Sequence, residues 1–161
     1  MAIASVLTDS FKTELMRSGH NFDTAGATPA GNAFKLALYT SSANLGTTTT
    51  VYATTNEVTN ASGSAYVAGG KALVNTGVTT STVTSHTDFA DLSVANGTAW
   101  TSASFTTRGC LIYNTTAVSG FTTNRAVCSI DFGGDKTVSN GTFSIEFPTN
   151  SSSAAIIRLT S

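Results

Sequence analysis

The chain has 161 residues, of which 11% are charged, and its 8 basic and 9 acidic side chains give a net charge of -1. Ordinary globular chains contain roughly 25% charged residues. No excess of positive charge is available to gather phosphates, which argues against nucleic acid and membrane surfaces as partners. At this length we expect one domain, residues 1–161, that folds without the help of metals or disulfides.

The N-terminal segment predicts one short helix, over about residues 8–18. Four apolar residues recur every four positions, and Gly19 stands where a helix could end through a left-handed cap. This apolar stripe must be buried on something and is the candidate interface of the chain: Ile3, Leu7, Phe11 and Leu15. Two alternatives remain open for what buries this stripe: a neighbouring protein, or the end of the chain's own β domain.

The same segment bears on where the protein is made. Asp9, Lys12 and Glu14 interrupt the apolar residues, and no basic residue precedes them, so no signal peptide is predicted. No stretch approaches the ~20 apolar residues that span a bilayer. We therefore expect synthesis in a cytoplasm, where the protein stays soluble. A reducing compartment favours free thiols at Cys110 and Cys128, although both fall in successive predicted strands.

Turn-forming residues after the helix predict a loop, so residues 1–33 form a helix-and-loop arm and residues 34–161 the β domain. The first clear strand is FKLALYTS, which starts at Phe34 and alternates apolar and polar residues. Small polar residues from Ser41 to Gly70 predict a long ordered loop, and one irregular helix or edge strand around Val51 to Val58 remains open. Two further strand candidates follow, with a bend near Ser85 and His86: KALVNTGVTTSTVTSHTDF and ADLSVANG.

The last third of the chain, Thr98 to Thr160, has the strongest strand pattern. Its alternating runs are TAWTSASFTT, RGCLIYNTT, NRAVCSIDF, TFSIEF and AAIIRLT. In TFSIEF, Phe143, Ile145 and Phe147 share one face, as in a half-buried antiparallel strand. The link GGDKTVSNG before it contains glycine and asparagine, which predict a hairpin. Roughly seven to nine strands, about ten residues apart, predict an all-β fold: an antiparallel β-sandwich or jelly roll with one short N-terminal helix.

The residues suggest no catalytic centre. The only histidines, His20 and His86, are far apart, lack ligands at metal spacing and are predicted to lie in loops. The chain contains no G-x-S-x-G nucleophile motif. We therefore expect no enzymatic activity, no cofactor and no metal. Tyr39, Trp100 and Tyr113 could form a sugar-binding platform, but single aromatic residues in strands more often belong to the core.

The order of several sequence blocks resembles a family of small virion structural proteins of tailed bacteriophages. The resemblance covers nearly the whole chain and runs through FKLALYTSSANLGTTTTVY, AYVAGGKAL, AWTSASFTTRGCLIYN, NRAVCSIDFGGDKTVSNGTFSIEFP and AIIRL. It implies a β-sandwich or jelly-roll-like protein that resides on the virion after synthesis in the host cytoplasm. It carries over no catalytic residue.

From this resemblance we expect a head decoration or cement protein that stabilises the capsid. Its partners would be the major capsid protein or other virion proteins, with neither nucleic acid nor membrane among them. A homotrimer is expected, because junctions between capsid subunits impose symmetry. Two other functions remain open: a neck or tail component, and a carbohydrate-binding module that attaches the virion to its host.

Overall fold

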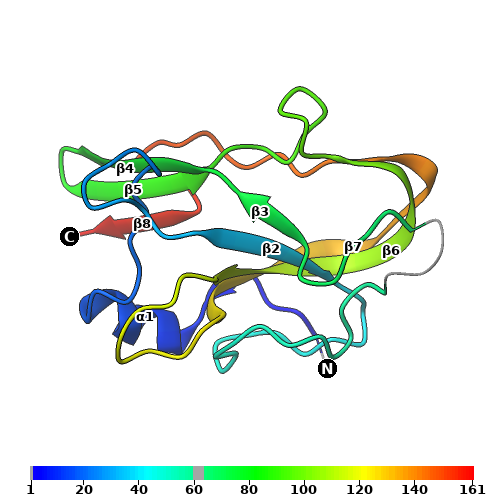
Figure 1. The fold of residues 1–161 in the computed structure, drawn as a ribbon, viewed down its shortest axis with the longest axis horizontal. Coiled ribbons are helices and arrows are strands. Elements are labelled where there is room, and N and C mark those ends of the chain that lie inside the picture. Colours follow the sequence, from blue (N-terminus) through cyan, green and yellow to red (C-terminus); the bar gives the residue numbers. More distant parts are fainter. Residues whose placement is uncertain (1, 60–63) are drawn as a thin grey trace.

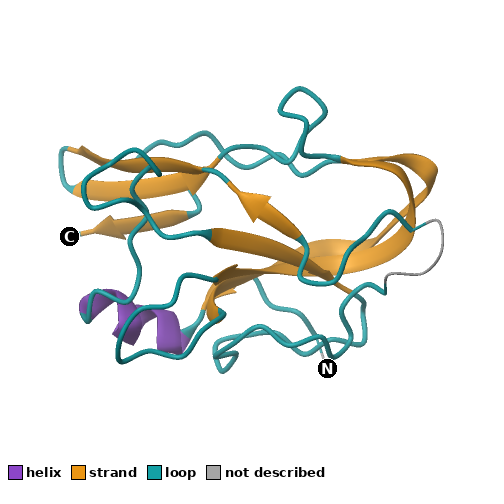
Figure 2. Cartoon of the chain, in the orientation of Figure 1, coloured by secondary structure: helices purple, strands orange, loops and turns teal. Residues whose placement is uncertain are grey.

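The computed structural model describes residues 2–59 and 64–161 and confirms the predicted all-β fold with one short helix. Two antiparallel sheets form a sandwich, and the helix lies at one end of it (Figures 1 and 2). The larger sheet has the strand order β1-β7-β6-β2-β3, and the smaller one β4-β5-β8. The elements are β1 (Val6–Leu7), α1 (Asp9–Met16), β2 (Phe34–Tyr39), β3 (Lys71–Leu73), β4 (Asn75–Ser81), β5 (Thr84–Phe89), β6 (Trp100–Asn114), β7 (Arg125–Phe143) and β8 (Ile157–Thr160).

Strand β2 is buried on both faces, because each face of the five-stranded sheet is covered. Phe34, Leu36 and Leu38 enter the main core, to which the three-stranded sheet contributes Phe89 and Ile157. Side chains from the opposite face of β2 enter a second, smaller core, whose members are Ile3, Ala37, Tyr39, Ala43, Leu45, Leu111, Tyr113 and Ala126. The predicted strand at Phe34 is therefore confirmed, but it is a central strand rather than a half-exposed one.

The second core depends on the long loop after β2. In its described parts, residues 41–59 and 64–70, this loop contains only turns and isolated bridges, as predicted. Ile3 forms a parallel bridge with Leu45, and Val51 forms an antiparallel bridge with Arg125. The loop and the N-terminal residues therefore pack on one face of the larger sheet.

Strands β6 and β7 pair along nearly their whole length. The sequence predicted two strands in place of β6, and a strand, a hairpin within residues 133–141 and a second strand TFSIEF in the region of β7. These predictions are wrong, because β7 continues to Phe143 and the rest of TFSIEF is extended, with one bridge from Ile145 to Leu92. Between the pairs Thr107–Lys136 and Gly109–Asp131, β6 advances by two residues but β7 by five, so the extra residues of β7 bulge out of the pairing. Gly133 (φ 74°) and Asn140 (φ 45°) therefore use their positive φ in bulges rather than in a turn.

The chain reverses at Thr82 and Val83, where a two-residue turn joins β4 to β5 and Ser81 pairs with Thr84. The predicted bend near Ser85 and His86 is therefore misplaced by a few residues. ADLSVANG is not a strand either, because it consists mainly of turns and one bridge between Leu92 and Ile145.

Helix α1 begins after Thr8, whose side-chain oxygen accepts a hydrogen bond from the Phe11 backbone N–H. This N-cap satisfies one of the free amides of the first turn. The left-handed residue at its other end is Ser18 (φ 61°), not Gly19 as predicted. Gly19 is needed for close approach, since a Cβ there would lie 2.9 Å from the Phe121 ring. Among residues 2–59 and 64–161, no helix has the length and apolar character needed to cross a membrane.

Candidate functional site: surfaces and buried polar clusters

The four residues of the predicted interface do not form one stripe on a helix. Ile3 and Leu7 precede α1, and Val6–Leu7 pair with β7 as strand β1. Ile3 is 5% exposed and Phe11 1%, so both are buried within the protomer. Leu7 and Leu15 are partly buried against the main core. The N-terminal segment is thus part of the sandwich rather than a separate arm, and its apolar residues close one end of the chain's own core.

A buried polar cluster joins the end of α1 to the start of β7. Arg125, at 0% exposure, donates from Nη2 to the Gly19 carbonyl (2.6 Å) and from Nη1 to the Thr122 carbonyl (2.7 Å). Its Nε lies 3.8 Å from Glu14 Oε2. His20 Nε2 contacts the same Glu14 oxygen at 2.8 Å. These groups bind one another and the backbone, so the cluster holds the fold together.

A second buried polar cluster surrounds Glu57, in the loop after β2. Its carboxylate accepts hydrogen bonds from the Tyr66 hydroxyl (2.6 Å), the Tyr52 hydroxyl (2.7 Å) and the Gly69 amide (2.7 Å). Tyr113 packs its ring on Tyr52, with the ring centroids 4.5 Å apart. Burial, together with the Glu57 charge, raises the pKa of Tyr113 to about 12, so its hydroxyl stays protonated. No sequence signal marked Glu57: its donors lie in the same long loop, and this loop has no periodic pattern that shows which side chains turn inward.

The aromatic residues considered for a sugar platform lie in the interior. Tyr39, Trp100 and Tyr113 are each 2% exposed. Trp100 packs against Phe105 and Phe143 in edge-to-face contacts. A glycan stacks on an exposed ring face, so these three residues do not offer one.

The histidines and cysteines are also used within the fold. His20 lies in a loop as predicted but is buried, whereas His86 lies in β5. Cys110 and Cys128 are both buried and free, and burial raises the pKa of each thiol. Their reduced state in the purified protein remains a prediction. Within the described part of the chain, no group of three or more His, Cys, Asp or Glu residues is placed to hold a metal ion.

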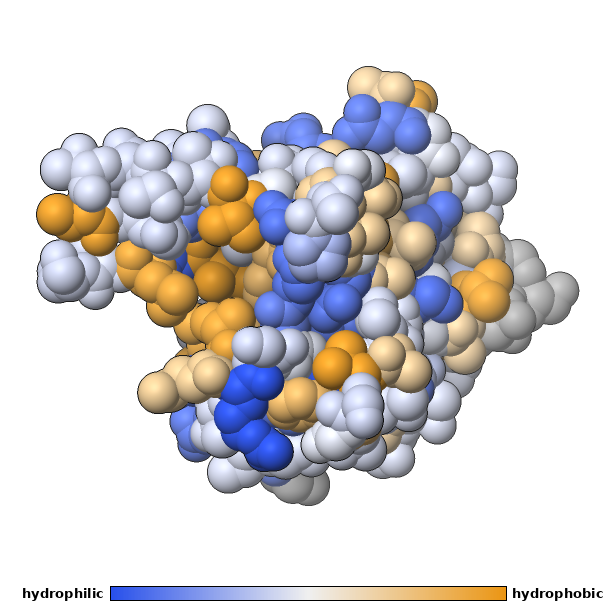
Figure 3. Space-filling view, turned by 60° about the vertical axis from the view of Figure 1, so that its left-hand side comes forward, coloured by the Kyte–Doolittle hydropathy of each residue, from blue (hydrophilic) through white to orange (hydrophobic). Residues whose placement is uncertain are grey.

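Hydrophobic surface gathers at the end of the molecule where α1 meets the three-stranded sheet (Figure 3). A small hollow of about 90 Å³ lies there, and its apolar lining is Leu15, Phe22, Val78, Ile157 and Leu159. Met16, the last residue of α1, is 90% exposed, and Val78 and Leu159 are more than half exposed. Of the five lining residues, Phe22 and Ile157 are buried. We call these five lining residues the apolar end surface.

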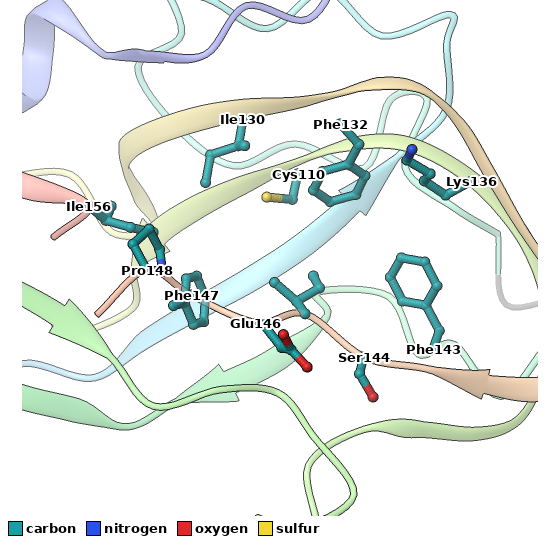
Figure 4. Close-up of a pocket in the computed structure, with 11 residues that line it drawn as sticks. Cys110, Ile130, Phe132, Lys136, Phe143, Ser144, Glu146, Phe147, Pro148 and Ile156 are labelled. Atoms are coloured by element: carbon teal, nitrogen blue, oxygen red, sulfur yellow. The ribbon is translucent and has the colours of Figure 1, made fainter. Parts of the chain in front are cut away.

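A larger hollow of about 540 Å³ opens between β7 and the extended segment that follows it (Figure 4). Its apolar walls come from Ile130 and Phe132 on β7, and from Phe143, Ile145, Phe147 and Ile156 across from them. Cys110 of β6 and Lys136 of β7 complete the lining with Ser144, Glu146 and Pro148. We call this hollow the interlayer cleft. The alternation in TFSIEF was visible in the sequence, but the strand opposite it was not.

The two buried polar clusters are engaged within the fold, whereas four buried side-chain atoms of the described residues have no hydrogen-bond partner: Asn75 Oδ1, His86 Nδ1, Arg125 Nε and Asn150 Oδ1. No family model, no curated protein and no solved structure matches this chain.

Proposed function

We propose that the protein is a structural protein of a tailed-bacteriophage particle, a head decoration or cement protein that binds at junctions between capsid subunits. The observation that carries this proposal is the ordered series of sequence blocks that resembles such a family. The two-sheet fold is compatible with it, because a protein that reinforces a shell needs a rigid domain. Low charge is also compatible, since contacts that involve few charges depend little on salt.

The apolar end surface is the contact region that we assign to this function. Exposed apolar surface of this kind commonly marks a protein interaction site. The partner is the capsid shell, and the decoration protein binds it as a symmetric homo-oligomer, in our proposal a trimer. Ile3 and Phe11 do not take part, because they are buried within the protomer.

A neck or tail position is the alternative among structural proteins. A carbohydrate-binding role is less well supported, since Tyr39, Trp100 and Tyr113 are buried. A map of the intact virion separates the structural roles by position and copy number. Many copies spread over the shell are expected for decoration, whereas a few copies at a single vertex would contradict it.

A binding experiment tests the contact region. Val78→Asp and Leu159→Asp change exposed side chains that line the hollow, so both variants are expected to fold and to lose binding to particles that lack the protein. Val94→Asp is the matched control, because Val94 is 64% exposed and is not part of the apolar end surface. Undiminished particle binding by Val78→Asp and Leu159→Asp would contradict the assignment.

A further inference from the structure

The interlayer cleft exposes an unusual amount of apolar side chain for a position inside a sandwich. Six large apolar residues line it, and each is only partly buried although each packs on the main core: Ile130, Phe132, Phe143, Ile145, Phe147 and Ile156. In a closed sandwich such side chains would meet across the two layers and exclude water. Here Phe132 and Phe143 approach each other, with ring centroids 6.5 Å apart, but about 540 Å³ remains between the two walls.

The size and lining of the cleft resemble those of small-molecule sites. Such sites are concave, measure roughly 300–1,000 Å³ and combine mostly apolar walls with a few polar groups that fix orientation. The Cys110 thiol points into the cleft (Figure 4), and its raised pKa keeps it neutral. It therefore adds to the apolar lining.

The charged groups around the cleft decide which charge on a ligand fits it. Lys136 lies at one end, beyond Phe132, while the side chains of Ser144 and Glu146 point away from the hollow (Figure 4). This follows from strand alternation, because Phe143, Ile145 and Phe147 occupy the inward positions. The nearby Asp131 carboxylate is held by Arg108 at 2.7 Å and 3.2 Å. Within the described residues, Lys136 makes no ion pair.

We propose that the interlayer cleft binds a small amphipathic anion, with its apolar body between the two layers and its anionic group at Lys136. A medium-chain fatty acid has this chemistry: one carboxylate and a flexible hydrocarbon chain that follows an elongated apolar hollow. This binding is independent of the position of the protein on a virion, and its test uses the isolated chain.

The test compares two probes of equal chain length, dodecanoate and dodecan-1-ol, by calorimetric titration of the full chain below the micelle concentration. Dodecanoate is expected to bind more tightly, since only it carries the charge that complements Lys136. Amide shifts in NMR spectra should change at the cleft, including Phe132 and Ile145. Changes confined to the apolar end surface would overturn the assignment.

Two variants separate the contributions of charge and shape. Lys136→Glu is expected to weaken the binding of dodecanoate about five- to thirtyfold and to leave the affinity for dodecan-1-ol unchanged. Glu146→Gln is the matched control on the opposite wall and should leave both affinities unchanged, because its side chain points away. Equal losses in these two variants would overturn the role of Lys136.

Filling the cleft tests its shape. Ile145→Trp is expected to abolish binding of both probes, and Ile130→Phe provides a smaller filling change if the first variant does not fold. Undiminished binding by a folded, filled variant would show that the probes bind elsewhere. A different outcome would be that the wild-type chain binds neither probe and that the filled variant differs from it in oligomeric state. This would assign the cleft to a second copy of the chain and overturn the proposal.

Discussion

Arg125 is a charged side chain with no solvent exposure, and its position explains why its neighbours are polar. It reaches the Gly19 carbonyl beside α1, while Asn114 on β6 contacts His20 Nδ1 at 3.1 Å. A buried charge is costly unless it is paired and hydrogen-bonded, and Glu14 supplies the opposite charge. Removal of Glu14 would therefore leave Arg125 without its opposite charge and His20 Nε2 without its hydrogen-bond partner.

His20 gives this cluster a pH dependence. Burial lowers the pKa of His20 from its usual 6.5, and the hydrogen bond to Glu14 opposes this only in part. The neutral ring suits both contacts, because Nε2–H donates to Glu14 and Nδ1 accepts from Asn114. The unfolded chain therefore takes up the proton more readily, and the free energy of unfolding should fall as the pH drops below about 6.5.

Urea unfolding between about pH 8 and pH 5 measures this effect. His20→Gln should show a flatter dependence in this range, because the variant has lost the titrating group. Parallel curves for the wild type and the variant would contradict the assignment.

Glu57 supports a second residue-scale prediction. Glu57→Gln replaces one acceptor oxygen by an NH₂ group, which faces donors from Tyr52, Tyr66 and Gly69. Because a buried donor is left unpaired, the free energy of unfolding should fall by about 1–3 kcal/mol. Tyr52→Phe removes only one of the three hydrogen bonds to the carboxylate and introduces no mismatched donor, so it should cost less than Glu57→Gln. Denaturant midpoints at unchanged slope give both values, and a larger loss for Tyr52→Phe would be inconsistent with this account.

At the scale of elements, the β4–β5 turn has a residue poorly suited to its backbone. Thr82 is β-branched and has φ 54°, a region that glycine enters at little cost. Thr82→Gly should therefore stabilise the protein by about 0.5–1 kcal/mol and raise Tm by about 1–4 °C. Thr80→Gly, one residue before the end of β4, is the control and should lower Tm. A lower Tm for Thr82→Gly would contradict the role of the turn.

Helix α1 is held to the sandwich by Phe11, whose ring packs edge-on against Phe22 and His20. Phe11→Ala should cost about 3–5 kcal/mol of unfolding free energy, as for other buried phenylalanines. Met16→Ala should change stability little, because Met16 is exposed. Thermal unfolding with light scattering measures both stability and assembly. A Phe11→Ala protein that keeps its stability but loses an oligomer would restore Phe11 as an interface residue.

At the scale of the whole molecule, the charge balance predicts whether the protein binds nucleic acid. With a net charge of -1, the chain should not bind DNA tightly at ~150 mM salt, because few phosphate charges can be neutralised. Titration of labelled duplex DNA at two salt concentrations tests this. A strong affinity that falls steeply with salt would show a basic surface that the overall charge conceals.

The sequence by itself determined the class of the fold and several of its parts. Alternation is a local, period-2 property, so it identified β2 and β8 and the inward set Phe143, Ile145 and Phe147. The helix was predicted from its apolar spacing, although Phe11 and Leu15 lie in α1 whereas Ile3 and Leu7 precede it. Small polar residues likewise predicted the long loop after β2.

Only the tertiary structure decided which partner each segment meets. Glycine and asparagine permit a positive φ in a turn or in a bulge, and pairing of β7 with β6 selected the bulge. Ile3 and Phe11 are apolar in either case, but the second core and the main core cover them within the protomer. The interlayer cleft forms where β7 and the Phe143–Phe147 segment face each other without closing, and such non-local contacts leave no trace in local periodicity.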